Sequence, residues 1–456
     1  MSNGNGMLDP AAFEELVTDG TIDTVICAVP DPHGRLMGKR LTVNSFRSLG
    51  LSGEGIHASS YLFASDLEMT PLDLPISSGA NGWADVRLVP DLGTLRRVPW
   101  EPYAALVICD AYASDSDDLI EVSPRTMLRR QVERAASAGL TLKFASELEF
   151  YLAAQDPATA LEREYRDLPM TSGYRGDYQI LQSSRDEWFI RQIRTLMPQF
   201  GIPVESSKTE WGLGQQEITL DYCATMEMAD RHLLFKHGIK DLAQRNKLTA
   251  SFMAKPSIDE VGSSCHLHVS LWSADDQPLG WADGGMSDIF GAFVAGQLDH
   301  AVGLGLMFAP TINSYKRFVP DQFAGTAICV GHDNRSCAFR LVGSEASYRL
   351  ENRIPGADIN PYYAYAATIA AGLDGIERNL PRPPIFSGNA WRDDSLELMP
   401  AALHGSIQHF ADSKLARSAF GEETHEHLLA FYRAELGAFE SGTVTDWERR
   451  RYFERI

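Results

Sequence analysis

Short segments of this chain alternate between apolar and polar residues, and this alternation predicts β-strands. In residues 143–152 the apolar side chains take one face, and Glu147 and Glu149 lie side by side on the other. Successive side chains of a strand point to opposite faces, so a period of two indicates a half-buried strand. Two carboxylates on one face of a strand repel each other unless a cation or a proton lies between them.

Three further segments alternate in the same way and carry polar side chains on one face. They are residues 216–220 with Glu217, residues 264–271 with His266, His268 and Ser270, and residues 349–354 with Arg349, Glu351 and Arg353. For any one of these segments, a face exposed to water is an equally good interpretation. Their repetition favours a polar cavity built on one sheet.

Helical signals lie between the predicted strands. Ser123 is a suitable N-cap, Pro124 can begin a helix and Gly139 can end it. Further helices are expected at residues 186–199, 226–247, 287–307, 361–379 and 424–438. Strands and helices therefore alternate through most of the C-terminal part.

A run of Asp and Ser at residues 114–118 is the best candidate for a linker between two domains. Upstream of it, short apolar runs such as residues 24–29 and 104–109 predict a small sheet with little helix. We therefore divide the chain into residues 1–113 and residues 114–456. A length of 456 residues is sufficient for two domains.

The polar segments together supply five carboxylates and one or two imidazoles. These are Glu147, Glu149, Glu210, Glu217 and Glu351, with His266 and His268. Ligands that are mostly oxygen, without thiolates, favour Mg²⁺ or Mn²⁺ over zinc, and this number suffices for two ions. Two metals beside clustered arginines are typical of phosphoryl transfer, with ATP as the expected donor. The chain has neither a P-loop nor a dinucleotide-binding glycine motif.

Charge and composition argue against some classes of binding partner. A formal net charge of −20 argues against nucleic acid and anionic membranes as partners. The longest apolar stretch, near residues 289–310, is interrupted by Asp299 and His300, so no membrane span is expected. The six cysteines show no paired spacing, which favours reduced thiols and a cytoplasmic location.

Six ordered motifs resemble those of the glutamine synthetase family, over a region from about residue 20 to residue 448. They are Ser-Glu-Leu-Glu-Phe (146–150), Gly-Gln-Gln-Glu-Ile (214–218), Gly-Ser-Ser-Cys-His-Leu-His-Val-Ser-Leu (262–271), Asn-Ser-Tyr-Lys-Arg (313–317), Asn-Arg-Ser (334–336) and Arg-Leu-Glu-Asn-Arg-Ile-Pro (349–355). The resemblance implies an α+β fold: a small N-terminal β-grasp domain, then a large catalytic domain whose curved antiparallel sheet forms a half-barrel flanked by helices. It also implies a dodecamer of two hexameric rings, in which the N-terminal domain of one subunit closes the site of its neighbour.

The resemblance assigns roles to individual residues. Glu149, Glu210 and Glu217 would hold one metal, and Glu147, His266 and Glu351 the other. Gly262, Arg317 and Arg353 match positions that bind glutamate, and Arg335 and Arg340 match positions on the phosphates. Glu205, Tyr222, His268, Ser270 and Arg349 match the lining of the nucleotide pocket. In the implied reaction, ATP phosphorylates the γ-carboxylate of L-glutamate and an amine displaces phosphate, while Arg340 and Arg353 neutralise the phosphoryl group and Glu351 belongs to the catalytic set.

Two departures from the family pattern concern the amine. Where ammonia-using members have an aspartate that binds ammonium, this chain has His57, and where they have a flap glutamate, it has Phe323. Both negative charges of the ammonium site are therefore missing. An aromatic ring and an imidazole can contact an alkyl chain or a hydroxyl group, so the departures favour a larger primary amine.

A primary alkylamine has a pKa of roughly 10.4 and is almost fully protonated at neutral pH, so a base is needed before it can attack. His57 could serve as that base, as a selectivity residue, or only as a packing residue of the amine pocket. The two replacements are neutral or basic, which favours a small monoamine such as ethanolamine over a polyamine with its distal charge. The alternatives are a γ-glutamylpolyamine synthetase, a glutamine synthetase that uses ammonia, and a non-catalytic sensor of glutamate or nucleotide.

Overall fold

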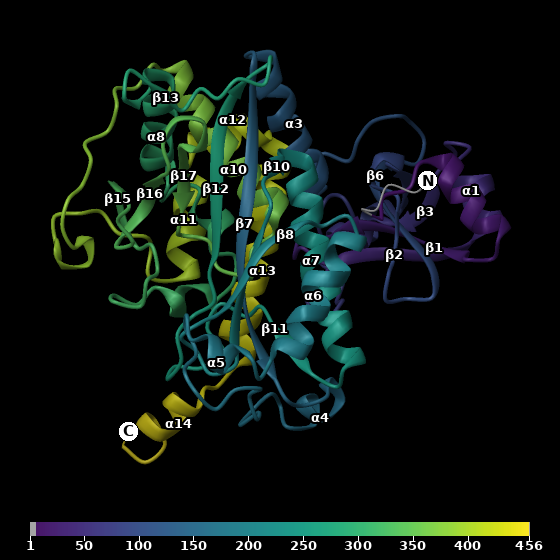
Figure 1. The fold of residues 1–456 in the computed structure, drawn as a ribbon, viewed down its shortest axis with the longest axis horizontal. Helices are drawn as coiled ribbons and strands as arrows, with labels where there is room; N and C mark the ends of the chain where they lie inside the picture. Colours follow the sequence, from purple (N-terminus) through teal and green to yellow (C-terminus); the bar gives the residue numbers. More distant parts are fainter. Residues whose placement is uncertain (1–5, 456) are drawn as a thin grey trace.

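Two β-sheets organise the chain in the computed structural model, which describes residues 6–455 (Figure 1). The first sheet has the strand order β2-β1-β6-β4-β3, with β5 paired to β6. Its strands are β1 (Ile22–Pro30), β2 (Leu36–Thr42), β3 (Ile56–Ser59), β4 (Asp85–Pro90), β5 (Arg96–Arg97) and β6 (Tyr103–Ala113). Helix α1 (Pro10–Thr18) packs on this sheet through Phe13, and the short α2 (Val43–Ser45) follows β2. The expected small N-terminal sheet is present, with one helix that the apolar runs did not predict.

The second sheet is larger and curved, and it has the order β15-β16-β17-β12-β7-β9-β8, with β10 and β11 also paired to β7. Its strands are β7 (Leu140–Ala153), β8 (Val204–Thr209), β9 (Gln215–Leu220), β10 (Cys223–Ala224), β11 (Thr249–Ser251), β12 (Cys265–Ser273), β15 (Ala327–His332), β16 (Cys337–Val342) and β17 (Arg349–Asn352). A separate hairpin joins β13 (Trp281–Ala282) and β14 (Gly285–Met286). The long strand β7 is central, because it pairs with four of the other strands.

Helices flank the large sheet, as Figure 1 shows, and together with the sheets they confirm the predicted α+β fold. They are α3 (Pro124–Ser137), α4 (Pro157–Glu162), α5 (Ile180–Ser183), α6 (Glu187–Gln199), α7 (Thr225–Arg245), α8 (Asp288–His300), α9 (Gly305–Phe308), α10 (Pro361–Glu377), α11 (Leu403–Asp412), α12 (Lys414–Phe420), α13 (Glu422–Gly442) and α14 (Asp446–Tyr452). Among the described residues, no helix is both long and apolar enough to cross a bilayer. The division after residue 113 stays a prediction, and β6 ends at that residue.

One predicted helix was wrong in its extent. Residues 287–307 were expected to form a single helix, but α8 ends at His300 and α9 begins at Gly305. Gly303 and Gly305 lie at the interruption, and glycine weakens a helix because its backbone loses more freedom than that of other residues.

The register of the large sheet aligns its polar positions across neighbouring strands. In the antiparallel pairs, Glu147 lies opposite His266, and Glu149 lies opposite Glu217. Glu351 of β17 lies opposite His268 on one side. Directly opposed residues share a face of the sheet, so this register gathers the polar side chains on one face.

A buried ion cluster joins the N-terminal sheet to the helices of the large sheet. The side chain of Arg125, in α3, is 2% exposed. Its guanidinium contacts Asp110 of β6, Asp91 at 2.7 Å and Asp230 of α7 at 3.0 Å. Because these three carboxylates come from different parts of the chain, Arg125 holds together elements that the sequence separates by more than a hundred positions.

Replacing Arg125 with alanine should destabilise the protein by about 3 kcal/mol or more, because it leaves the buried carboxylate of Asp230 without its arginine partner. Urea unfolding followed by circular dichroism measures this loss. Arg130→Ala is a matched control on the same helix, since Arg130 is exposed and pairs with Glu121 at 2.6 Å. The control should cost less than about 1 kcal/mol. Equal losses for the two variants would contradict the importance assigned to the cluster.

Candidate active site

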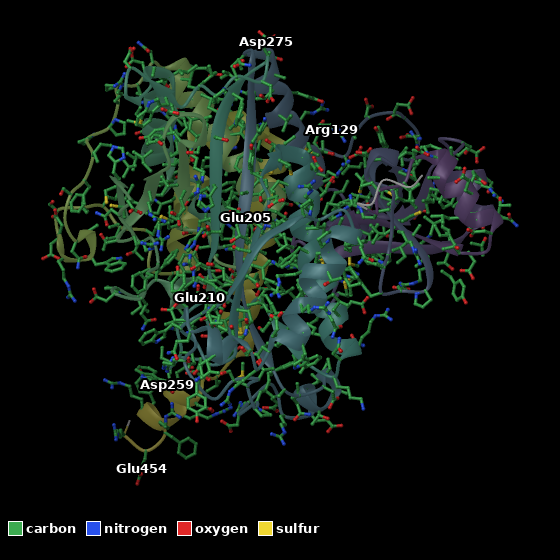
Figure 2. All side chains as sticks on the ribbon, in the orientation of Figure 1. Arg129, Glu205, Glu210, Asp259, Asp275 and Glu454 are labelled. Atoms are coloured by element: carbon green, nitrogen blue, oxygen red, sulfur yellow. The ribbon has the colours of Figure 1, made fainter. Side chains whose placement is uncertain are left out.

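The side chains expected to hold the first metal meet at one face of the large sheet. Glu149 on β7, Glu217 on β9 and Glu210 directly after β8 bring carboxylate oxygens within 4.8 Å of one another. Figure 2 shows Glu210 lower on the sheet than Glu205, which belongs to the same strand region. Three carboxylates at this spacing can surround one divalent cation.

The second expected set lies beside the first. Nδ1 of His266 is 3.2 Å from a carboxylate oxygen of Glu147 and 3.6 Å from one of Glu351. His268 also comes within ligand distance of Glu147 and Glu351, and Glu217 comes within it of Glu147 and His266. Glu147 and Glu217 therefore border both sets, which places the two sets next to each other.

The first set carries more negative charge than its surroundings neutralise. Burial, together with the charges of Glu210 and Glu217, raises the pKa of Glu149 well above its usual range. Burial and the charges of Glu147 and Glu210 likewise raise the pKa of Glu217 to about 8. A bound divalent cation would remove the repulsion that causes both shifts.

The second set is neutralised by protein groups. Burial alone would raise the pKa of Glu351, but Arg353 and the neighbouring imidazoles outweigh burial and lower it to about 2. Burial and the charge of Arg353 lower the pKa of His266 to about 4. At neutral pH, His266 is therefore an uncharged imidazole, which is the form that binds metals.

The donor atoms fit hard divalent cations. The two sets consist of carboxylate oxygens with one or two imidazole nitrogens, and Nε2 of His266 is buried without a hydrogen-bond partner. Mg²⁺ and Mn²⁺ favour ligands of this kind. When bound there, such ions would supply the positive charge that neutralises a phosphoryl group in transfer.

Two arginines are fixed beside the metal ligands by Glu351. Nη1 of Arg340, on β16, donates to a Glu351 oxygen at 2.8 Å, and Arg340 also pairs with Asp333. Nη1 of Arg353 donates to the other Glu351 oxygen. Glu351 thus holds both guanidinium groups where they can meet an anion, and their role in phosphoryl transfer, which the family resemblance implies, stays a prediction.

The other two residues expected to bind glutamate, Gly262 and Arg317, pack against each other. Arg317 is 2% exposed, and its guanidinium donates to Oγ of Ser264 at 3.1 Å and to the carbonyl of Ile354. A Cβ atom at Gly262 would lie 2.3 Å from Cγ of Arg317. Glycine is therefore required at position 262 for the arginine side chain to pass.

A cavity of about 930 Å³ opens next to the metal cluster. The residues expected to bind the nucleotide all line it: Glu205, Tyr222, His268, Ser270 and Arg349. Arg340 lines an adjoining depression, and the exposed Arg335 lines a further one. The adjoining depressions share His332 and Asp333, so the predicted nucleotide and phosphate residues follow one continuous surface.

The two residues expected in the amine pocket lie in different places. The carbonyl of Phe323 accepts a hydrogen bond from Nη2 of Arg353 at 3.2 Å, so Phe323 is close to the metal cluster. His57 lies on β3 of the N-terminal sheet, and Figure 1 shows β3 and β17 on opposite sides of α7. One chain does not bring His57 to its own metal ligands, and a second copy is needed if His57 is to reach a site.

Sequence analysis missed three residues of the site. Nζ of Lys208 contacts Glu210 and lies 4.0 Å from Glu217, and Nε2 of Gln215 donates to Glu149 at 3.1 Å. Lys208 shares a strand face with Glu210 at a spacing of two, a signal that could have found it. The third, Trp391, lies in a loop and contacts Phe323, and no periodic pattern marks it.

Comparisons with known proteins agree with this arrangement. Residues 121–452 match the family described as "Glutamine synthetase, catalytic domain". A γ-glutamylethanolamide synthetase (GlnA4) of Streptomyces coelicolor is 42% identical, covering 98% of this chain and 96% of the relative. A glutamate–isopropylamine ligase of a Pseudomonas species is 34% identical and covers 97% of both chains. Among solved structures, the ADP complex of GmaS has a TM-score of 0.84 at 27% identity, covering 96% of this chain and 98% of that one.

Addition of Mg²⁺ should raise the thermal unfolding midpoint, because a cation bound by the folded state stabilises it by about 2.7 kcal/mol at a hundred times its Kd. Glu149→Gln should be at least as stable as the wild type without metal, since it removes a repelled buried carboxylate, but should lose most of the gain from Mg²⁺. Differential scanning fluorimetry with and without EDTA measures both effects. Glu133→Gln on α3 is the control and should keep the full gain. A Glu149→Gln variant that responds to Mg²⁺ like the wild type would exclude this residue as a ligand.

Proposed function

The chain belongs to the glutamine synthetase family, and from this premise we propose that it joins L-glutamate to a small primary monoamine such as ethanolamine, with ATP as the energy source. Two relatives that match almost the full chain are named for ethanolamine and isopropylamine as partners of glutamate. The product is a γ-glutamyl amide.

The reaction proceeds in two transfers. The γ-carboxylate of glutamate attacks the terminal phosphorus of ATP, which releases ADP and leaves γ-glutamyl phosphate. The neutral amine then attacks the acyl carbon, phosphate leaves, and the amine proton passes to a base. Two Mg²⁺ or Mn²⁺ ions on the two ligand sets would neutralise the phosphate oxygens, while Arg340 and Arg353 orient and neutralise the group in transfer.

The observation that carries the choice of amine is the environment of Phe323. Its ring is 57% exposed, and Arg353 holds its carbonyl beside the metal ligands. The acid closest to it in sequence, Asp321, is already paired with Arg392. An ammonium ion finds no free carboxylate in Asp321, whereas an alkyl substituent gains contact with the ring.

The same charge balance favours a monoamine over a polyamine. The distal ammonium of a polyamine needs a carboxylate that is free to pair with it, and Asp321 is neutralised by Arg392. Ethanolamine carries a hydroxyl group instead, which water or a polar side chain can satisfy. A sensor without catalysis is disfavoured, because the full set of costly buried carboxylates is retained.

His57 enters this proposal from a second copy of the chain. It lies exposed on β3 at the edge of the N-terminal sheet, where a neighbouring subunit could meet it. A dodecamer of two hexameric rings would place such an edge against the metal site of the adjacent subunit. His57 would then contact the amine and receive its proton.

Phosphate release with glutamate, Mg²⁺ and ATP should be fastest with ethanolamine in a panel of ammonium, ethanolamine, putrescine and spermidine. The expected preference for ethanolamine over ammonium is at least about tenfold in kcat/KM, the ratio that roughly 1.4 kcal/mol of differential binding gives. A coupled enzymatic assay for phosphate measures it. Ammonium as the best substrate would contradict the proposal, and no release with any amine would favour the sensor.

His57→Ala should lower kcat/KM for ethanolamine and change its pH profile, with little effect on the KM for ATP. The reason is that His57 meets only the amine in this proposal. Steady-state rates between pH 6 and pH 9 give the profile, and His404→Ala, at an exposed histidine of α11, is a control. Unchanged turnover and an unchanged profile would exclude His57 both as a base and as a selectivity residue.

A further inference from the structure

Two loops that lie 68 positions apart in the sequence are fastened together next to the metal cluster. The ring centroids of Phe323 and Trp391 are 5.6 Å apart at an interplanar angle of 82°, an edge-to-face contact. Nε1 of Trp391 donates to the carbonyl of Ala324 at 3.3 Å, and Arg392 pairs with Asp321. We call Phe323 and Trp391 the aromatic pair. Three contacts of different kinds fix the pair in one arrangement.

The aromatic pair is connected to the reacting region through Arg353. Nη2 of Arg353 donates to the carbonyl of Phe323, and Nη1 of the same side chain donates to Glu351. Phe323 has a φ of 58°, in the left-handed region that is unfavourable for a phenylalanine. Phe323 therefore has an unfavourable backbone conformation in which its carbonyl contacts Arg353 and its ring packs against Trp391.

One acid on each loop, two positions from the aromatic residue, has partners. Asp321 pairs with Arg392, and a carboxylate oxygen of Asp393 accepts hydrogen bonds from the backbone N–H and the hydroxyl of Ser395. A cationic amine that approaches Arg353 beside the aromatic pair thus meets aromatic faces, and the acid two positions from each ring is already engaged. Aromatic faces attract alkylammonium groups and also contact their methylene groups.

Resting on the proposed ligase function, we propose that Trp391 is a specificity-determining residue for the amine. Its indole, braced by Phe323, contacts the substituent and the ammonium group of a short primary alkylamine as the amine approaches γ-glutamyl phosphate. Trp391 does not touch the metal ligands, and glutamate and ATP bind to other residues. Loss of the indole should therefore weaken the binding of the amine without weakening the binding of glutamate or ATP.

Kinetics of Trp391→Leu test this assignment with ethanolamine as the probe. The variant should raise the KM for ethanolamine about tenfold, the loss expected when a partly desolvated cation–π contact is removed. The KM values for glutamate and ATP should stay within about twofold of the wild type, because their contacts are intact. Trp391→Phe keeps an aromatic face and should recover most of the affinity. Trp188→Leu, the same substitution at an indole of α6 that is 51% exposed, should leave all three KM values unchanged.

A second measurement does not depend on turnover. Ethanolamine added to the wild type with glutamate, Mg²⁺ and a non-hydrolysable ATP analogue should change the tryptophan fluorescence, and the change should be lost in Trp391→Phe. This keeps the assignment testable if Trp391→Leu fails to fold.

Separate outcomes overturn the assignment and the proposed function. An unchanged KM for ethanolamine in Trp391→Leu, or equal rises in the KM values for ethanolamine and glutamate, would reject Trp391 as an amine contact. A wild-type preference for ethanolamine would still support the ligase function in that case. A wild type that works best with ammonium would reject the proposed function, and with it the assignment.

Discussion

Mutual repulsion among carboxylates on adjoining strands is the constraint on which the rest of this structure depends. The register of β7 with β9 and β12 places Glu147 and Glu149 opposite another polar side chain, so the acids cannot move apart without breaking the sheet. Repulsion at this spacing in a poorly solvated site is costly. The folded state tolerates it only because cations, from the protein or from solution, lie among the acids.

The protein supplies its own cations unevenly. Around Glu351, Arg340 and Arg353 nearly complete the neutralisation, and the carboxylate stays ionised. Around Glu149, the contacts are Gln215 and a backbone N–H, while Lys208 pairs with the neighbouring Glu210 and Glu217. A metal ion bound by the first set would therefore remove more electrostatic repulsion than one bound by the second set. The second set instead fixes two arginines, so Glu351 is placed to serve both the proposed metal and the proposed phosphoryl position.

On the side of the site that we propose faces the amine, aromatic contact replaces charge. There Asp321 is paired with arginine and Asp393 with serine, and Phe323 lies on a strained backbone beside Arg353. In the function that we propose, charge would attract the phosphates and the metals at one end of the site, while contact area would select the nucleophile at the other. This separation explains how a family scaffold can change its amine without changing its metal ligands.

The sequence was sufficient to predict which face of each strand is polar. It was not sufficient to predict which strands pair with one another. Alternation placed Glu147, His266 and Glu351 on polar faces, because the side-chain period of a strand is local. The pairing that brings them together depends on long-range register, which only the family resemblance supplied. Trp391 lies in a loop with no period, whereas Lys208 shares a strand face with Glu210 and could have been found from that spacing. The break between α8 and α9 was missed because an apolar run gives the same pattern on either side of a turn.

The two-metal centre is the central claim, and crystals grown with Mn²⁺ and ADP test it most directly through anomalous scattering. The account predicts two peaks on one face of the large sheet, one among Glu149, Glu210 and Glu217 and one among Glu147, His266 and Glu351. A single peak, or peaks away from these residues, would contradict it.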